Sequence, residues 1–432
     1  MNLVVNGGGS LKGSVSAPPS KSYTHRAFII STLAEGKSEI FGPLISRDTI
    51  ASIRACEALG AVIERRSEKV WCVSGSPSPK TPEDVINVDN SGTTIRIMTA
   101  VSSLAPGFTV LTGDSSIRQR PMGPLIKSLG DLGVRCFSTK GDDKPPIVVE
   151  GGGIKGGKTN IPGHISSQFI SALLIACPLA KNETRISFTS ELKSEPYLEI
   201  TMEVLSLFKG NIKYLPNIGV VIPPKQTYSP ASVRIPGDFS SAAFILSAAA
   251  ITDSDVKIHN LDMGSKQGDK KIVDILVKMG AEVEFGENYV RVIGGHKLKG
   301  ISFDCGNNPD LLPILAVLGS VAEGKTDIFN AQHVRYKESD RVSAMAKELS
   351  KMGIRIDEKI DGLTIHGGKL KGAHVETYND HRILMALAVA ALAAEGETII
   401  SGVESVDVSY PSFLEDMNSL GANFRRMNKN DG

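Results

Sequence analysis

The chain repeats one pattern six times, and this repetition limits its possible folds more than any other feature of the sequence. Each copy begins with Ser, Asn or Asp and continues into a helix rich in Ala, Leu and Ile. A turn, a β-branched strand, a second helix ending near Leu-Gly or Met-Gly, and a final strand follow. The spacing of roughly 70 residues is long for a solenoid unit, so we interpret each copy as β-α-β-α-β-β. The copies open at Ser22, Asn90, Ser166, Ser240, Asp310 and Asp380.

A segment rich in Pro and Ser, residues 223–236, separates the first three copies from the last three. The chain has 432 residues, more than a single hydrophobic core usually supports. We therefore expect an α/β fold of two domains with three copies each. The opening strand within residues 1–16 is expected to complete the last copy, so the chain would cross near Pro18 and near Ser232. The predicted domains are residues 1–18 with 232–432, and residues 19–231.

The composition excludes several classes of function. The net charge of +1 argues against nucleic acid or a membrane surface as a general partner. The five cysteines show no metal-binding spacing, so no metal site is expected, and their odd number fits a reducing compartment. The chain begins without a signal peptide and has no apolar run of about 18 residues. We expect a cytoplasmic protein.

Basic and amide side chains gather at the starts of the predicted helices. Taken alone, each Ser, Asn or Asp there is explained by plain N-capping, and each charged group by a solvated helix face with ion pairs. As a group they indicate something else, because helix N-termini carry unpaired N–H groups that favour anions. Glu338 and Arg341 are three apart and can share one helix face. The group also includes Lys21, Arg26, Arg96, Gln168, Arg118, Arg120, Lys337 and Arg382.

A series of short segments then resembles the 5-enolpyruvylshikimate-3-phosphate synthase family, from about Gly13 to about Asp416. Each segment alone is weak evidence, but their order and spacing are highly specific. The resemblance implies two domains that close on the substrates, with the active site in the interdomain cleft. It also implies a monomer without organic cofactor or catalytic metal. The segments are PSKSYTHRA, DNSGTTIR, TGDSSIRQRPMGPL, GHISSQF, SEPY, GDFSSAAF, YKESDR and YNDHR.

The resemblance also implies an activity and its residues. The family transfers the enolpyruvyl group of phosphoenolpyruvate to shikimate 3-phosphate, in the synthesis of chorismate and the aromatic amino acids. The implied catalytic residues are Asp310, Glu338 and Lys21. The implied shikimate 3-phosphate contacts are Lys21, Ser22, Arg26, Ser166, Ser167, Gln168, Ser194, Tyr197, Asp310, His333 and Lys337. The implied phosphoenolpyruvate contacts are Lys21, Gly92, Arg120, Gln168, Arg341 and Arg382.

By hypothesis, Asp310 deprotonates the 5-hydroxyl of shikimate 3-phosphate, and Glu338 protonates the methylene carbon of phosphoenolpyruvate and later recovers the proton. Lys21 assists as a neighbouring acid, and its role and that of Glu338 are interchangeable at this point. Two positions depart from the family pattern. His333 stands where well-known members have Asn, which adds pH sensitivity. Val408 stands where many members have a Lys that contacts phosphoenolpyruvate, which predicts weaker binding or compensation from elsewhere.

Three alternatives stay open. An enolpyruvyl transferase acting on UDP-N-acetylglucosamine shares the fold, but it usually begins with Lys-Asn, whereas this chain has Lys21 and Ser22. It also commonly has a cysteine in the loop that corresponds to residues 113–121, where this chain has none. An RNA 3′-phosphate cyclase-like enzyme would be expected to have a basic surface. The third alternative is non-catalytic, a repeat scaffold or a homologue that only binds shikimate 3-phosphate.

Overall fold

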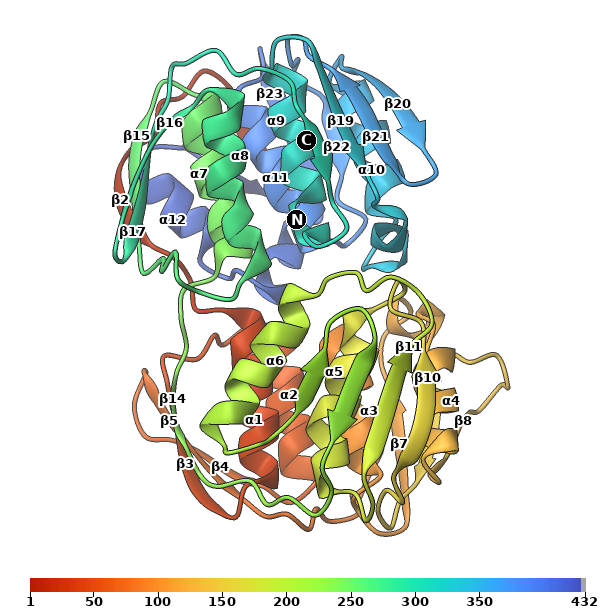
Figure 1. Cartoon of the computed structure of the whole chain (residues 1–432). Helices are drawn as coiled ribbons and strands as arrows, with labels where there is room; N and C mark the ends of the chain where they lie inside the picture. Colours follow the sequence, from red (N-terminus) through yellow and green to blue (C-terminus); the bar gives the residue numbers. More distant parts are fainter. Residues whose placement is uncertain (429–432) are drawn as a thin grey trace. The chain divides into compact units, whose positions relative to one another are not determined.

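The computed structural model describes residues 1–428 and divides the chain into two compact units (Figure 1). Unit 1 contains Met1–Pro18 and the chain from Pro236 onward, and unit 2 is Pro19–Ile235. The second crossing therefore follows Ile235, a few residues after the predicted position near Ser232. The reason is that strand β14 (Ser232–Arg234) still pairs in parallel with β3 (Gly36–Phe41) of unit 2.

Unit 2 contains three four-stranded sheets within the described residues. Each combines one parallel pair with an antiparallel hairpin, as the β-α-β-α-β-β reading requires. The first sheet is β14, β3, β5 (Val70–Gly75) and β4 (Val62–Arg65). The second is β6 (Ile86–Asn87), β7 (Phe108–Thr112), β9 (Ile147–Glu150) and β8 (Arg135–Ser138). The third is β10 (Gly157–Ile161), β11 (Thr184–Phe188), β13 (Gly219–Ile222) and β12 (Lys213–Leu215).

The helices of unit 2 fall into two kinds. The first helix of each copy is buried almost throughout and carries the apolar core: α1 (Lys21–Leu33), α3 (Gly92–Ser102) and α5 (Ser167–Ala176). The second helices, α2 (Arg47–Ala58), α4 (Gly123–Asp131) and α6 (Pro196–Leu207), bury one face only. Two short 3₁₀ helices, η1 (Ile117–Gln119) and η2 (Cys177–Leu179), complete the unit.

Unit 1 repeats this plan in the described residues. Its first sheet is β2 (Lys12–Ser16), β15 (Asp255–His259), β17 (Tyr289–Ile293) and β16 (Glu282–Gly286). The second is β18 (Ser302–Asp304), β19 (Lys325–Phe329), β21 (Gly362–His366) and β20 (Arg355–Lys359). The third is β22 (His374–Glu376), β23 (Glu397–Ser401), β1 (Asn2–Asn6) and β24 (Arg425–Met427).

The buried helices of unit 1 are α7 (Phe239–Ile251), α9 (Leu312–Val321) and α11 (His381–Leu392), which pack against one another. The half-buried helices are α8 (Lys271–Met279), α10 (Arg341–Lys351) and α12 (Phe413–Ser419). Four 3₁₀ helices link these elements: η3 (Gly268–Lys270), η4 (Pro309–Leu311), η5 (Gln332–Tyr336) and η6 (Val403–Val408). η3 and η4 run directly into α8 and α9, whereas four residues separate η5 from α10.

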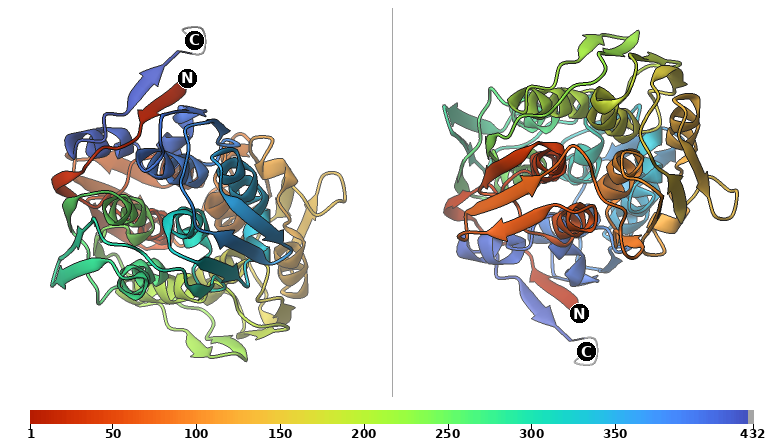
Figure 2. Two further views of the ribbon diagram at one scale, coloured as in Figure 1. Left: turned by 90° about the horizontal axis from the view of Figure 1, so that it is seen from above. Right: turned by 90° about the horizontal axis from the view of Figure 1, so that it is seen from below.

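The opening segment corrects one expectation. It forms two strands instead of one: β1 pairs with β23 and β24 and completes the last copy, whereas β2 pairs with β15 and begins the fourth. Figure 2 shows β1 beside β24, near the two chain ends. The glycine run after β1 explains the break. A Cβ on Gly7 would lie 1.7 Å from the carbonyl oxygen of Ala394, and Gly8 has φ +84°.

Among residues 1–428, no helix combines the length and the apolar character needed to cross a bilayer.

Candidate active site

The helix starts carry most of the predicted site residues, but the caps themselves differ in part from the prediction. Ser166 and Asp380 cap α5 and α11 as expected, each accepting a backbone N–H with its side chain. Elsewhere the cap is a neighbour of the predicted residue: Ser20 before α1, Ser91 before α3 and Asp238 before α7. Segments with several capping residues offer competing starts, and tertiary packing selects among them. The predicted openers Ser22 and Ser240 lie inside their helices, and Asp310 lies in η4.

Lys21 begins α1 and pairs with Asp48 on α2, with 2.7 Å between Nζ and the carboxylate. His25 lies one turn further, fully buried, and its Nδ1 is 2.7 Å from the Ser52 hydroxyl. Burial lowers the pKa of His25, so the ring is neutral at pH 7. Burial alone would raise the pKa of Asp48, but the charge of Lys21 together with the interactions of His25 outweighs it, and the pKa lies well below its ordinary value. Asp48 is therefore an ionised counterion that fixes the Lys21 ammonium.

Arg26 is buried at 1% exposure, and neighbouring helices take up its guanidinium. Nε donates to the Thr201 hydroxyl at 2.7 Å, and Nη2 donates to the Tyr197 carbonyl at 3.2 Å. Nη1 donates to the Ser22 carbonyl at 3.0 Å. Burial lowers the pKa of Arg26 to about 10. The hydrogen bonds to Thr201 and Tyr197 connect α1 to α6.

The starts of α3 and α5 meet through polar side chains. Arg96 donates to the side-chain oxygen of Gln168 at 2.5 Å, and the Gln168 amide donates to the Thr93 hydroxyl at 3.0 Å. Arg120 follows η1 and is 5% exposed. A Cβ on Gly92 would lie 2.3 Å from Nη1 of Arg120. Any side chain at position 92 would therefore displace the guanidinium of Arg120 from its observed place.

The remaining predicted residues of unit 2 lie at the starts of α5 and α6. Ser167 is the first residue of α5 and is buried. Ser194 is buried and adopts a left-handed conformation with φ +58°, which is uncommon for serine. Its carbonyl accepts the backbone N–H of Tyr197 at 3.1 Å, in the turn that begins α6.

Unit 1 holds a buried cluster of charges around Arg341. Nη1 of Arg341 is 2.8 Å from Asp310, Nη2 is 2.7 Å from Glu338, and Nε is 2.8 Å from Asp380. The arginine side chain is 1% exposed and Asp380 is fully buried. Arg382 contacts the second oxygen of Asp310 at 3.2 Å. Lys337 lies 3.7 Å from the first oxygen of Asp310.

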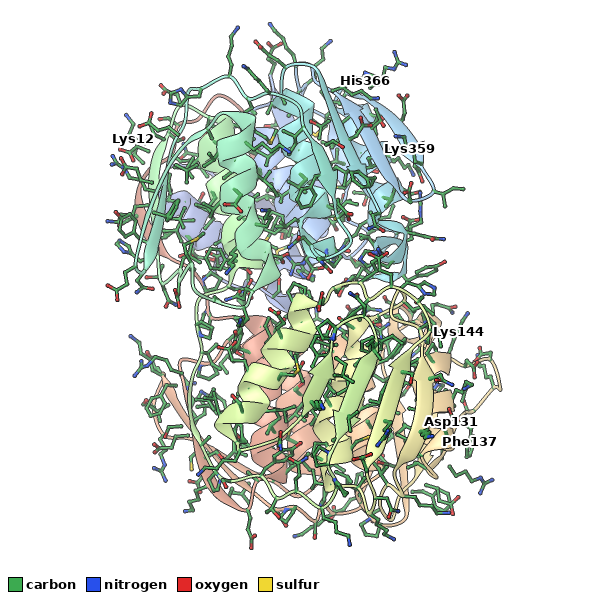
Figure 3. The ribbon with its side chains drawn as sticks, in the orientation of Figure 1. Lys12, Asp131, Phe137, Lys144, Lys359 and His366 are labelled. Carbon is green, nitrogen blue, oxygen red and sulfur yellow. The ribbon has the colours of Figure 1, made fainter. Side chains whose placement is uncertain are left out.

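Within this cluster, Arg341 and Asp380 each favour the ionised form of the other. Burial works against the charge of Arg341, but Asp380, Glu338 and Asp310 outweigh it and raise the pKa of the guanidinium above its ordinary value. For Asp380, burial likewise favours the neutral acid, yet Arg341 lowers the pKa of the carboxyl. Such a cluster differs from the exposed pairs on the outer strands, where Lys359 and His366 extend from β20 and β21 (Figure 3). Exposed pairs contribute little, whereas buried ones are costly to break.

The comparisons with known proteins agree with the motifs. The family model described as EPSP synthase (3-phosphoshikimate 1-carboxyvinyltransferase) matches residues 5–417. The chain belongs to this family. It is 51% identical over 423 residues to a 3-phosphoshikimate 1-carboxyvinyltransferase of Methanosarcina mazei, covering 97% of each chain. It is 52% identical over 412 residues to the enzyme of that name from Methanocella arvoryzae, covering 95% of this chain and 96% of the relative.

Solved structures extend the similarity to the fold. The EPSP synthase of Acinetobacter baumannii matches with a TM-score of 0.82 at 29% identity, covering 98% of this chain and 99% of that one. The predicted enolpyruvyl transferase-like fold is thereby confirmed, and the chain is a carboxyvinyltransferase homologue over nearly its full length.

The two departures from the EPSP synthase pattern lie in short 3₁₀ helices of unit 1. His333 lies in η5 and is 8% exposed, and Val408 is the last residue of η6 and is 6% exposed. Val408 is thus packed as an apolar side chain. The predicted weakening of phosphoenolpyruvate binding stays a prediction.

Three acidic residues in or beside these clusters were not among the predicted site residues. Asp48 lies in the first turn of α2, where an acidic residue is ordinary, so the sequence carries no signal for its pairing with Lys21. Asp380 was visible only as a cap and in the segment YNDHR. Asp269 lies in η3, outside every helix start that we singled out, and its partners come from distant parts of the chain.

Proposed function

We propose that this chain transfers the enolpyruvyl group of phosphoenolpyruvate to the 5-hydroxyl of shikimate 3-phosphate and releases phosphate, a step in the synthesis of chorismate and the aromatic amino acids. The observation that carries the proposal is the buried cluster in which Arg341 pairs with Asp310, Glu338 and Asp380. The cluster contains cations that can bind the anionic phosphoenolpyruvate and carboxylates that can transfer protons. Membership of the EPSP synthase family supports the same reaction.

The reaction requires an addition and an elimination. A proton adds to the methylene carbon of phosphoenolpyruvate, and the 5-hydroxyl oxygen forms a bond to the adjacent carbon as its own proton leaves. The product is a tetrahedral ketal that carries phosphate. The C–O bond to phosphate then breaks and a methyl proton is lost, which regenerates the double bond on the new ether. Each half therefore needs one acid and one base close to the two reacting carbons.

In our proposal Asp310 accepts the hydroxyl proton, and Glu338 delivers and recovers the proton at carbon. Both carboxylates accept hydrogen bonds from Arg341, at 2.8 Å for Asp310 and 2.7 Å for Glu338, so one guanidinium fixes the positions of both groups. Lys21, fixed by Asp48, assists as an acid and balances developing charge. Lys21 and Glu338 remain interchangeable as the proton donor.

The proposed binding residues divide between the units. Shikimate 3-phosphate would be bound by Lys21, Ser22, Arg26, Ser166, Ser167, Gln168, Ser194 and Tyr197 of unit 2 and by Asp310, His333 and Lys337 of unit 1. Phosphoenolpyruvate would be bound by Lys21, Gly92, Arg120 and Gln168 of unit 2 and by Arg341 and Arg382 of unit 1. Arginine suits both anions because its planar fork binds phosphate and carboxylate with two bonds.

The test is phosphate release from phosphoenolpyruvate, with shikimate 3-phosphate and UDP-N-acetylglucosamine offered in parallel as acceptors. Release that depends on shikimate 3-phosphate alone supports the proposal, and release with the sugar nucleotide alone refutes the assigned acceptor. Binding of shikimate 3-phosphate without release would favour a non-catalytic homologue. The proposal also includes a monomeric enzyme of the cytoplasm. Light scattering of the purified chain at micromolar concentration tests the oligomeric state.

A further inference from the structure

Asp269 is a buried acid next to the Arg341 cluster, and the reaction above assigns it no role. Its side chain accepts a hydrogen bond from the Ser240 hydroxyl at the start of α7 and another from the Asn308 amide at 3.3 Å. Asn308 immediately precedes η4, which carries Asp310. One carboxylate in η3 thus joins the first turn of α7 to the segment that presents Asp310.

Charged side chains on η4 and α11 also interact with Asp269. Asp310 repels it from η4, and Arg382 attracts it from the first turn of α11. Arg382 also contacts Asp310 at 3.2 Å, and its Nη1 lies 3.5 Å from the Ser240 carbonyl. The buried Cys305 thiol also interacts with Asp269: burial, followed by the charges of Asp269 and Asp310, raises the pKa of Cys305 well above its ordinary value. Arg382 therefore interacts with two carboxylates, those of Asp269 and Asp310.

This arrangement costs stability. Burial, followed by the charge of Asp310, raises the pKa of Asp269 to about 6, against the attraction of Arg382. A group whose pKa is raised by folding contributes stability at low pH and loses it as the pH rises through the folded value. Above about pH 6, ionised Asp269 is therefore less favourable than a neutral side chain of the same shape.

The hydrogen bonds that hold this segment do not explain why residue 269 is charged. The neighbouring Gln267 already ties this segment to α7, since its side-chain oxygen accepts the Phe239 N–H at 2.9 Å and its amide donates to the Gly237 carbonyl at 2.7 Å. A neutral amide at 269 could still accept the Ser240 hydrogen bond, and its NH2 could donate to the Asn308 side-chain oxygen once that amide turns over, so both contacts have a neutral counterpart. A charge that costs stability where a neutral group would fit is a feature of functional sites.

We propose that Asp269 is a positioning residue: it fixes the segment that carries Asp310 and, by its charge, holds the Arg382 guanidinium in place beside Asp310. This inference rests on the proposed function of Asp310 and Arg382. Removing the charge would leave Arg382 less restrained but also freer to pair with an anion. Turnover should therefore fall while affinity for phosphoenolpyruvate is kept or improved, because an anionic ligand would compete with one carboxylate fewer.

The test compares Asp269→Asn with Asp274→Asn, a matched loss of one acid on α8 whose ion pair with Lys271 is exposed. Asp269→Asn should lower kcat by at least about tenfold, the scale of a small misplacement at a reacting centre. Its KM for phosphoenolpyruvate should not rise, and Asp274→Asn should behave as the unsubstituted protein. A kcat within twofold of that of the unsubstituted protein would overturn the inference.

Two measurements without turnover separate this role from a structural one and from failure of the proposed function. At pH 8 the melting temperature of Asp269→Asn should be unchanged or higher, whereas a structural role predicts a loss together with weaker binding. In calorimetric titration, Asp269→Asn should bind phosphoenolpyruvate at least as tightly as the unsubstituted protein does. Weaker binding would refute the inference that Asp269 restrains Arg382. If the unsubstituted protein releases no phosphate, the proposed function fails, and these two results still decide the role of Asp269.

Discussion

Replacing Arg341 by Met should destabilise unit 1 far more than a loss of the same charge at its surface. The substitution keeps an apolar stem of similar length but leaves Asp310, Glu338 and Asp380 without their shared cation. Breaking a buried ion pair from one side costs about 3–5 kcal/mol. In a unit of about 200 residues, each kcal/mol lowers the melting temperature by about 2–4 °C. The expected loss at pH 7.5 is therefore about 6–20 °C in the transition of unit 1.

Arg291 provides the matched control. It also contacts two carboxylates, Asp255 at 2.7 Å and Glu284 at 3.1 Å, but its side chain is 34% exposed. Exposed pairs contribute about 0–1 kcal/mol, so Arg291→Met should lower the melting temperature by no more than about 4 °C. Circular dichroism melts of both variants provide the comparison. Equal losses would refute the view that the Arg341 cluster behaves as buried charge.

The pH dependence gives the same prediction a second test. Arg341 lowers the pKa of Asp380, so this aspartate stabilises the protein above its unfolded pKa, and the contribution disappears as the pH falls through the folded value. Without Arg341, burial dominates and the carboxylates prefer to be protonated. The gap in melting temperature between Arg341→Met and the unsubstituted protein should therefore narrow from pH 7.5 to pH 4.5. A constant gap would mean that lost packing, not lost charge, causes the destabilisation.

Three further substitutions test the proposed roles by steady-state kinetics. Gly92→Ala should raise the KM for phosphoenolpyruvate about 10- to 100-fold, the cost of one charged hydrogen bond, because the new Cβ would displace Arg120; an unchanged KM would refute this contact. Asp48→Asn should lower kcat about 10- to 100-fold by releasing Lys21, and an unchanged kcat would remove Asp48 from the account. Glu338→Gln should lower kcat about 10²- to 10⁴-fold while leaving shikimate 3-phosphate binding nearly intact, and an equal loss of both would refute its role as acid.

The sequence predicted the repeat and the class of fold because both depend on local patterns. Alternating apolar helices and β-branched strands identify a copy without knowledge of its neighbours. The split of the opening strand was not anticipated, because it depends on Gly7 packing against Ala394, which is distant in sequence. The limit of unit 2 also shifted, since a short strand such as β14 is defined by its partner β3 and not by its own residues.

For the candidate site too, the sequence predicted a contact between residues close in the chain and missed contacts between distant ones. Glu338 and Arg341 do form the predicted contact, but not on a shared helix face, because α10 begins at Arg341 and Glu338 lies in the segment before it. Asp48 and Asp269 were missed because their partners are distant in sequence and only the fold brings them together. The substrate contact of Arg26 stays a prediction from the motif, whereas its hydrogen bonds to Thr201 and to the Tyr197 carbonyl depend on helix packing that the sequence does not show.

The most direct test of the central claim is the reaction carried out in D₂O with shikimate 3-phosphate and phosphoenolpyruvate, followed by mass spectrometry of the product. Addition and elimination through a ketal pass through a methyl group that has gained a deuteron from solvent. We predict a product in which the enolpyruvyl methylene carries deuterium, in a proportion that grows with each passage through the ketal. A product without deuterium in that methylene, or no product from shikimate 3-phosphate, would contradict the account.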